Sequence, residues 1–443
     1  GVTGFYLKEH SMNESPLKKH NRRGFMSSTA AASLAASTMV HSATAAKSDP
    51  RPLRLAVIGC GGRGRGAIDD SLTINSGVTL VAAADLQLEN CQRLFAGVSK
   101  AHPDKVDAKT TKLYSGLDGY KQVLDDPDVD VVLLTTSPGF RPLMVQAAVQ
   151  AGKHVFAEKP VCIDAAGYRA CKASHDLAEQ NKTAIVTGTQ YRRQVNYIAA
   201  VEQIRSGAIG EIVNITARYC TGGIWYRPRK EGMSDTEYQL TNWMHFIWLS
   251  GDQICEQAVH NIDTFNWVMG ENPLSAYASG GRFTRPTDSE MWDSMSVAYE
   301  YPNGRTVSFM CRQIPGSQGL NDNVIYGTEG TCQIGAANSG SRIFDRKGKQ
   351  IWEKEGRIKD AYREEHRALI ESIRNETPIV ELAQTANSSM VGVLGRVAAY
   401  TGKKVTWDFM TTQSTLDLFP KSLTWDGALP SKGYAVPGKT KPV

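Results

Sequence analysis

The sequence predicts an α/β protein with an N-terminal, doubly wound parallel (Rossmann) sheet, followed by an α+β domain with a large, open, mostly antiparallel sheet. Three observations predict this fold. Short apolar runs alternate with helix-like segments up to residue 189, and a glycine-rich turn follows the first run. From about residue 190, longer runs alternate apolar and polar residues and are joined by hairpin turns. The first pattern is typical of parallel sheets covered by helices, and the second of antiparallel sheets with one solvated face.

The first element is a strand at Leu55–Ile58, whose unbroken apolar run is typical of a strand buried on both faces. The turn after it has the spacing G-x-G-x-x-G. In that motif the first glycine permits a tight turn and the second lets a pyrophosphate approach the backbone. The third allows close helix packing, while the helix N-terminus offers free N–H groups to the phosphates. The predicted cofactor-binding residues of this turn are Gly59, Gly61, Gly62, Arg63 and Gly64.

The second strand, Val78–Ala84, ends at Asp85. The dinucleotide fingerprint places an acidic residue at roughly this separation from the glycines, where it hydrogen-bonds a ribose 2′-hydroxyl. A carboxylate at this position would repel a 2′-phosphate. Asp85 therefore predicts that the cofactor is NAD rather than NADP.

The remaining elements of the first domain continue the alternation of strands and helices. They are a helix at Leu86–Val98, a strand at Val129–Leu134, a helix at Arg141–Ala151, a strand at His154–Ala157, a helix at Asp164–Asn181 and a strand at Thr183–Thr189. Ligands of such sheets bind outside the carboxyl ends of the strands. Thr136, Ser137, Glu158 and Lys159 follow two of these strands and are therefore predicted to lie at the cofactor site, although a surface turn also explains Glu158 and Lys159.

The second domain begins with a helix at Val195–Ser206. Its predicted strands are Glu211–Tyr219, Ser275–Arg282, Met295–Tyr301, Thr306–Gln313, Asn323–Tyr326 and Thr331–Ile334, and its later helices are Glu364–Arg374 and Gln384–Tyr400. Residues 302–304 and 328–330 are predicted hairpin turns. The domains are therefore expected at residues 47–189 and 190–405, with a surface tail at 406–443.

A second group of polar residues lies between these strands. If the segment forms one helix, Glu256, His260 and Asp263 fall on a single face, at i, i+4 and i+7. A carboxylate one turn from a histidine can hydrogen-bond its ring and raise its pKa, as a proton relay requires. A solvated polar face explains the spacing equally well. Lys159 would become a usable base if burial and an oxidised nicotinamide lowered its pKa.

Several segments together resemble the Gfo/Idh/MocA oxidoreductases. The most specific is Ala151-Gly-Lys-His-Val-Phe-Ala-Glu-Lys-Pro160, which is similar to the family's A-G-K-H-V-x-x-E-K-P, and 204–210 and 399–407 are similar as well. The resemblance implies that Lys159 lies beside the nicotinamide and the reacting carbinol. The family's D-x-x-x-H motif falls on Glu256 to His260, with glutamate in place of aspartate. Arg141 stands where relatives often carry a histidine.

These residues predict an NAD-dependent oxidoreductase that acts on a secondary alcohol of a sugar, polyol or glycoside. Lys159 would exchange the hydroxyl proton, and His260, oriented by Glu256, would relay it. The candidate substrate contacts are Tyr191, Arg192, Trp225, Trp243 and Asp263. Two alternatives remain open: a redox-assisted, NAD-dependent glycoside hydrolase, and a sugar-binding homologue without catalysis.

Composition excludes other classes of function. The net charge is +5, and no lysine- and arginine-rich block is interleaved with aromatic residues, so nucleic-acid binding is unsupported. The eight cysteines form no C-x-x-C pair and no zinc spacing. They are expected to be small buried side chains rather than disulfides or metal ligands, and no metal is predicted. A homo-oligomer, either a dimer or a tetramer, is expected.

The N-terminal segment predicts export. Arg22 and Arg23 precede Phe25, an alanine-rich apolar stretch and an Ala43-Thr44-Ala45 site. This order resembles a twin-arginine signal over residues 1–46, which would place the folded protein in the periplasm, with no membrane span in the mature chain. Because no dinucleotide pool is expected there, the cofactor should be tightly held. The residues expected to hold it are Arg63, Arg65, Arg141 and the segment 190–193.

Overall fold

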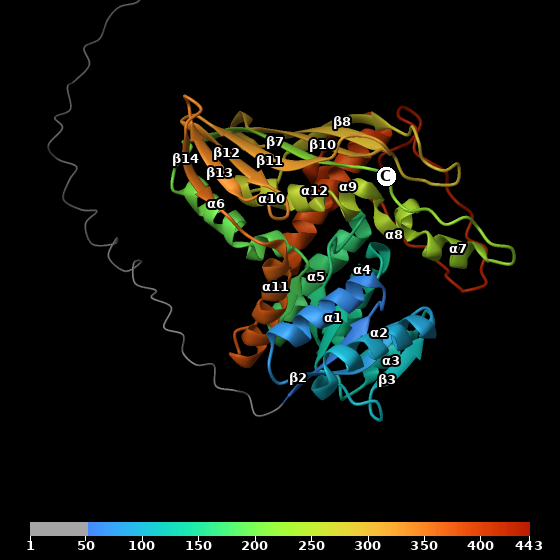
Figure 1. The fold of residues 1–443 in the computed structure, drawn as a ribbon. Coiled ribbons are helices and arrows are strands. Elements are labelled where there is room, and N and C mark those ends of the chain that lie inside the picture. The colour runs from blue at the N-terminus through green and yellow to red at the C-terminus, as the bar shows by residue number, and fades with distance from the viewer. Residues whose placement is uncertain (1–51) are drawn as a thin grey trace, which may run out of the picture. The chain divides into compact units, whose positions relative to one another are not determined.

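The computed structural model of the chain describes residues 52–443, which lie within one compact unit (Figure 1). The export signal predicted at 1–46 lies outside the described residues. Within the described part no helix is both long and apolar enough to cross a membrane.

The first sheet has six parallel strands in the order β3-β2-β1-β4-β5-β6. The strands are β1 (Leu53–Ile58), β2 (Val78–Asp85), β3 (Lys112–Ser115), β4 (Val131–Leu134), β5 (His154–Ala157) and β6 (Ile185–Thr187). The chain builds outward from β1 in one direction and from β4 in the other, so β1 and β4 flank the point where the order reverses. Ligands bind outside the strand ends at such a point. The doubly wound parallel sheet predicted from the sequence is confirmed.

Helices on both faces bury this sheet. They are α1 (Gly62–Ile74), α2 (Leu88–Ala101), α3 (Gly119–Asp125), α4 (Arg141–Gln150) and α5 (Ala165–Asn181). Every residue of β4 is buried, as expected for a central parallel strand covered by helices on both sides. The strand β3 was not predicted, because its four residues, none of them fully buried, carry no long apolar run.

The second sheet has nine strands in the order β14-β13-β12-β11-β7-β10-β9-β8-β15. They are β7 (Ile212–Thr221), β8 (Ser275–Gly281), β9 (Ser294–Glu300), β10 (Thr306–Gln313), β11 (Leu320–Gly327), β12 (Gly330–Gly335), β13 (Ser341–Asp345), β14 (Gln350–Lys354) and β15 (Val405–Thr406). All neighbours pair antiparallel except β7 and β10, which confirms the mostly antiparallel sheet. The strands missed from the sequence, β13 to β15, are short and lie toward the sheet edges, where apolar patterning is weak.

The helices of the second domain cover one face of this sheet and reach back to the first domain. They are α6 (Val195–Arg205), α7 (Asp235–Thr241), α8 (Ile247–Ser250), α9 (Asp252–Glu256), α10 (Val259–Met269), α11 (Ile358–Arg374) and α12 (Leu382–Thr401). The helix α12 is buried at every residue from Ser388 to Thr401 and packs against α5 and strands β8 and β9. The orange helix α11 packs against α1 of the nucleotide-binding domain (Figure 1). The two sheets are therefore joined by helices rather than by a mobile linker.

The single helix predicted through Glu256 and His260 is wrong. The helix α9 ends at Glu256 and α10 begins at Val259, with a break at Gln257 and Ala258. The N–H groups of both break residues donate to the carbonyl of Gln253, which ends α9 on a widened turn. Glu256 and His260 therefore do not share one helical face, and their relation is set by tertiary packing.

All eight cysteines are buried and free, as predicted.

The tail after β15 contains one short helical turn, Phe409–Gln413, and is otherwise irregular. It runs over the surface of α5, α7 and α8, where several of its backbone groups are hydrogen-bonded.

Candidate active site

A cavity of about 320 Å³ lies at the carboxyl ends of β1, β4 and β5. The first domain contributes the glycine turn, the loop after β4 and the segment after β5, and the second domain contributes the opposite wall. The lining residues are Gly61, Gly62, Arg63, Thr135, Thr136, Ser137, Pro138, Arg141, Glu158, Lys159, Gln190, Trp243, Glu256, His260 and Tyr362. The cavity thus brings together most of the residues predicted for the cofactor and for catalysis.

The glycine turn has the shape that a dinucleotide requires. Gly59 has φ +97°, and a Cβ there would lie 2.7 Å from the Thr136 nitrogen. A Cβ on Gly64 would lie 2.0 Å from the Gly59 carbonyl oxygen, so only glycine fits. By contrast, a Cβ on Gly61 or Gly62 would meet nothing within 4 Å, so the backbone at the cavity is open to a ligand. No side chain caps the N-terminus of α1, which leaves its N–H groups free for a pyrophosphate.

Asp85 lies beside this turn, where a ribose would be bound. Its carboxylate accepts hydrogen bonds from the Cys60 N–H at 2.7 Å and from Asn90 Nδ2 at 2.7 Å. These bonds fix the carboxylate at the end of β2. The open glycine backbone, the uncapped helix and the anchored acid together fit NAD.

Lys159 and Glu256 form the central pair of the cavity. Lys159 Nζ donates to the Glu256 carbonyl oxygen at 2.6 Å and lies 3.0 Å from Glu256 Oε1. Each side chain is 14% exposed, so the pair is largely shielded from water but reachable from the cavity. The break between α9 and α10 leaves the Glu256 carbonyl free of a helical partner and available to the ammonium group.

His260 is not held by Glu256, which corrects the predicted relay. No hydrogen bond joins their side chains among the described residues, because Glu256 is turned toward Lys159. Burial, together with the positive charges of Lys159 and Arg63, lowers the pKa of His260 well below its ordinary value. The expectation of a raised pKa is therefore wrong, and His260 is a neutral imidazole at physiological pH.

Arg63 links the glycine turn to the second domain. Its Nε donates to Glu158, and its guanidinium carbon lies 4.6 Å from the centre of the Tyr362 ring. Glu365 Oε2 is 3.8 Å from Arg63 Nη2. Burial would raise the pKa of Glu158, but the charges of Arg63, Lys159 and Arg141 together outweigh burial and lower it. Tyr362 and Glu365 lie on α11 and were missed, because nothing in their local sequence indicates a contact with a turn some 300 residues earlier.

Arg141 contributes a buried cation to the cavity. It is 2% exposed, and it donates to the carbonyl oxygens of Pro160, at 2.5 Å, and Thr136. Burial lowers the pKa of Arg141 to about 10, so the side chain stays protonated at neutral pH. No carboxylate forms an ion pair with it in the described part of the chain.

Four of the five predicted substrate contacts lie outside the cavity lining, and only Trp243 is in it. Arg192 and Asp263 form a bidentate ion pair at 2.8 Å, with Ser388 also bound to Asp263. The Tyr191 hydroxyl accepts a hydrogen bond from the Ala337 N–H. Trp225 packs against Trp243, with the centres of the two rings 6.2 Å apart. The polar groups of Arg192, Asp263 and Tyr191 are thus bonded to one another or to the backbone. The spacing of residues along the sequence cannot distinguish such contacts from contacts with a ligand.

Of the residues expected to retain the cofactor, Arg63, Arg141 and Gln190 line the cavity, whereas Arg65 and Arg193 do not. Arg193 is paired with Glu381 instead. Among residues 52–443 no cluster of histidine, cysteine, aspartate or glutamate is arranged to hold a metal ion.

Comparison with known proteins matches both domains. Residues 53–189 match an oxidoreductase family with an NAD-binding Rossmann fold, and residues 197–333 match the GFO/IDH/MocA C-terminal domain. A myo-inositol 2-dehydrogenase from Thermotoga maritima is 23% identical over 377 residues, which cover 80% of this chain and 96% of that protein. An inositol 2-dehydrogenase from Klebsiella pneumoniae is 24% identical over 256 residues, which cover 58% and 66%.

Solved structures share the fold. A levoglucosan dehydrogenase in complex with NADH and levoglucosan has a TM-score of 0.63 and 17% identity, and the match covers 80% of this chain and 99% of that one. A scyllo-inositol dehydrogenase from Lactobacillus casei with bound NAD(H) and scyllo-inositol has a TM-score of 0.62 and 16% identity, with coverage of 80% and 99%.

The fold and the cavity define an NAD-binding oxidoreductase, with a Rossmann domain and a sheet domain that meet at the cofactor site. The chain belongs to the Gfo/Idh/MocA oxidoreductase family.

Proposed function

We propose that the protein oxidises a secondary alcohol of a polyol or sugar, with NAD as the hydride acceptor. The observation that carries the proposal is the Lys159–Glu256 pair, which lies next to neutral His260 in the cavity that contains the glycine turn. The relatives named inositol dehydrogenases support a polyol as the substrate.

Bound NAD supplies the acceptor for the hydride that leaves the carbinol carbon. Lys159 Nζ binds the carbinol oxygen and takes its proton as the carbonyl forms. Before this transfer Glu256 Oε1, 3.0 Å from Nζ, takes a proton from the Lys159 ammonium group and leaves Nζ as a free amine, and after the reaction Glu256 passes that proton to water. Neutral His260 orients the substrate oxygen by a hydrogen bond.

The charges of the cavity favour a neutral substrate. Lys159 is paired with Glu256 and Arg63 with Glu158, while Arg141 is bound by two carbonyl groups. Among the lining cations in the described part of the chain, Arg141 alone is thus without a carboxylate partner, and its guanidinium is held by those two carbonyl groups. Trp243 offers an aromatic face against which the C–H face of a sugar or polyol ring can pack.

The test is a panel of inositols, monosaccharides and aryl glycosides, assayed by the absorbance of NADH and by aglycone release. We expect NADH formation with at least one polyol or sugar. Lys159→Met should bind NAD as the wild-type protein does and lose turnover by about 10²-fold or more. Near-wild-type turnover would remove Lys159 from the mechanism. Aglycone release would instead support the redox-assisted glycoside hydrolase, and neither signal would support a non-catalytic homologue.

We also propose that the protein is exported by the twin-arginine signal and keeps its cofactor through the cycle. Glu158 and Tyr362 both contact Arg63 at the glycine turn, and these contacts support retention of the cofactor. The NAD(H) content should survive prolonged dialysis of protein recovered from the periplasm. Rapid loss of cofactor, with activity that follows added NAD, would contradict retention.

A homo-oligomer is proposed through the uncovered face of the nine-stranded sheet. This face carries exposed apolar side chains, among them Tyr277, Met310 and Tyr326. Light scattering on the purified protein should give the mass of a dimer or tetramer, and a monomer at micromolar concentration would contradict the proposal.

A further inference from the structure

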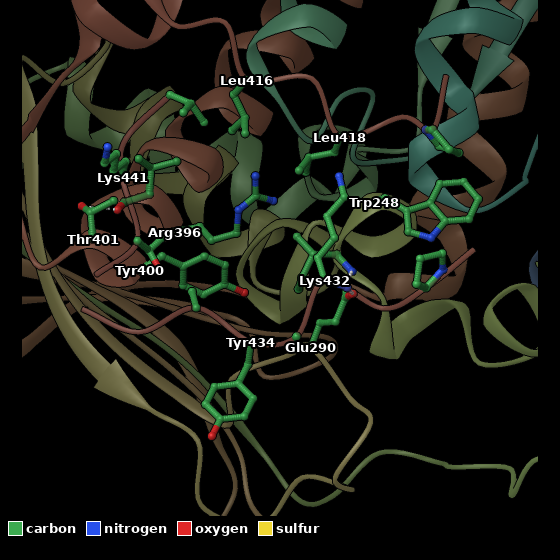
Figure 2. Close-up of a pocket in the computed structure, with 18 of the residues that line it drawn as sticks. Trp248, Glu290, Arg396, Tyr400, Thr401, Leu416, Leu418, Lys432, Tyr434 and Lys441 are labelled. Atoms are coloured by element: carbon green, nitrogen blue, oxygen red, sulfur yellow. Dashed lines mark hydrogen bonds between the residues drawn. The ribbon is translucent and has the colours of Figure 1, made fainter. Parts of the chain in front are cut away.

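A second cavity, of about 300 Å³, lies between the C-terminal tail and the body of the protein, and we call it the tail cavity (Figure 2). It shares no lining residue with the active-site cavity. Its size is in the range of sites that hold small organic molecules. No part of the proposed dehydrogenase mechanism uses it.

Polar contacts hold the tail above this cavity at several points. The Trp292 indole donates to the Ala435 carbonyl at 3.2 Å, and the Leu418 N–H donates to Asp164 at 2.8 Å. Glu290 accepts from the Ser431 hydroxyl and from the Lys432 N–H, both at 2.9 Å. The cover is thus fixed at several points while the space beneath it stays open.

The walls of the tail cavity are mostly apolar and come from both sides. The body contributes the side chains of Trp248, Val397 and Tyr400, and the tail contributes those of Leu416, Leu418 and Leu429. Apolar and aromatic walls with a few polar groups are typical of sites for small organic ligands. The occupant should therefore have a hydrocarbon body.

The charged groups of the tail cavity are mainly positive. Arg396 is 1% exposed, and its guanidinium donates to the carbonyl oxygens of Gly251 and Ile163, each at 2.8 Å. Lys432 and Lys441 stand at the rim. None of these three cations makes an ion pair within the part of the chain that the structure describes. Figure 2 shows Arg396 and Lys432 in one view with Trp248 and Tyr400.

One carboxylate, that of Glu290, lies among the lining residues together with these three cations. The Glu290 carboxylate already accepts three hydrogen bonds, the third from the Ile247 N–H. An oxygen of Val443 accepts from the Ser414 hydroxyl. A buried cation without an ionic partner is costly, so an anion at this position would be favoured.

We propose that the tail cavity is a second ligand site, which binds a small organic acid with an apolar body. Its carboxylate lies next to Arg396 and Lys432, and its hydrocarbon part packs against Trp248 and Leu418. A neutral molecule of the same shape would fill the apolar space but leave the cations unpaired.

The test compares octanoate with octanol by isothermal titration calorimetry on the full chain, purified with its cofactor. We expect octanoate to bind at least tenfold more tightly than octanol. Leu418→Trp, which fills the cavity from the tail side, should abolish octanoate binding. The pair Lys432→Met and Lys441→Met should weaken it at least fivefold. The matched control is Lys421→Met with Lys439→Met, which removes two tail lysines outside the cavity and should change binding less than twofold.

Melting temperatures within a few degrees of wild type show that the variants fold. Equal affinities for octanoate and octanol would overturn the proposal, as would the absence of binding by either. Octanoate binding that Leu418→Trp leaves unchanged would place the ligand elsewhere and would also overturn it.

Discussion

In the proposed mechanism Lys159 is the base, and Glu256 is the residue that contacts its amino group. A glutamate stands where the family pattern has aspartate. Its carboxylate extends to Lys159 Nζ at 3.0 Å rather than to the imidazole of His260. The proposed base and its proposed proton acceptor therefore come from different domains and meet only in the folded protein.

Replacing the Glu256 carboxylate tests this arrangement. Glu256→Gln keeps the size of the side chain but cannot accept a proton, so turnover should fall by about 10²-fold while NAD affinity stays unchanged. Steady-state kinetics and NADH fluorescence titration measure the two quantities. The control is Glu364→Gln, the same substitution on the exposed side of α11. Unchanged turnover in the Glu256 variant would show that Lys159 loses its proton directly to water.

His366 makes stability depend on pH. Its ring is buried against Phe156, with the ring centres 4.3 Å apart, and neither ring nitrogen has a hydrogen-bond partner within residues 52–443. Burial lowers the pKa of His366 from 6.5 to about 3. Because the unfolded chain binds this proton at a higher pH than the folded protein, stability is full above pH 6.5 and is lost as the pH falls toward 3.

Removing this titration should flatten the acid side of the stability curve. Between pH 7.5 and pH 5, His366→Leu should lose about 2 kcal/mol less unfolding free energy than wild type. Urea denaturation at the two pH values measures this difference. His175→Leu, on the partly exposed face of α5, is the comparison. A change of equal size in both variants would assign the effect to the loss of any histidine.

At the scale of elements, the helix α11 forms part of the wall of the cofactor cavity. It leaves the second sheet after β14 and packs on α1, directly behind the glycine turn. Tyr362 and Glu365, one helical turn apart, both face Arg63. Tyr362 thus places α11, a helix that is itself part of the core, in the wall of the cofactor cavity.

The aromatic ring of Tyr362 should slow the release of the cofactor. Tyr362→Leu removes the cation–π contact that holds Arg63 at the glycine turn, so NADH should dissociate several-fold faster. Tyr362→Phe keeps the ring and should release NADH at the wild-type rate. Stopped-flow fluorescence measures both rates. If the Phe variant also releases NADH quickly, the hydroxyl group and not the ring holds the cofactor.

At the scale of the whole molecule, the tail connects parts of the chain that are remote in sequence. Its start is bound to α5 of the first domain through Asp164 and Arg169. Its later part is bound to α7 and to Glu290 of the second domain. The tail therefore spans both domains and stabilises their arrangement.

Glu290 tests how much the tail contributes. Its carboxylate accepts three hydrogen bonds, from Ile247, Ser431 and Lys432. Because hydrogen bonds to a charged group contribute more than neutral ones, Glu290→Ala should lower the unfolding free energy by about 3 kcal/mol. Chemical denaturation measures the loss, with exposed Glu231→Ala as the control. A loss below about 0.5 kcal/mol would show that the tail is held independently of Glu290.

The sequence by itself determined the features that depend on neighbours along the chain. The buried strands, the glycine turn, Asp85 at a strand end and the Glu158–Lys159 segment all follow from local patterns, because backbone conformation and burial leave a periodic signal. The family could be predicted for the same reason, since its motifs are short and contiguous.

Only the tertiary structure decided which polar side chains meet. Glu256, Arg192 and Asp263 have the same residue types whether they bind a substrate or each other, and packing assigned Glu256 to Lys159 and Arg192 to Asp263. Tyr362 joined the site because α11 crosses back to the first domain. The physical reason is that ion pairs and cavity walls depend on distances across the fold, which the spacing of residues along the chain does not encode.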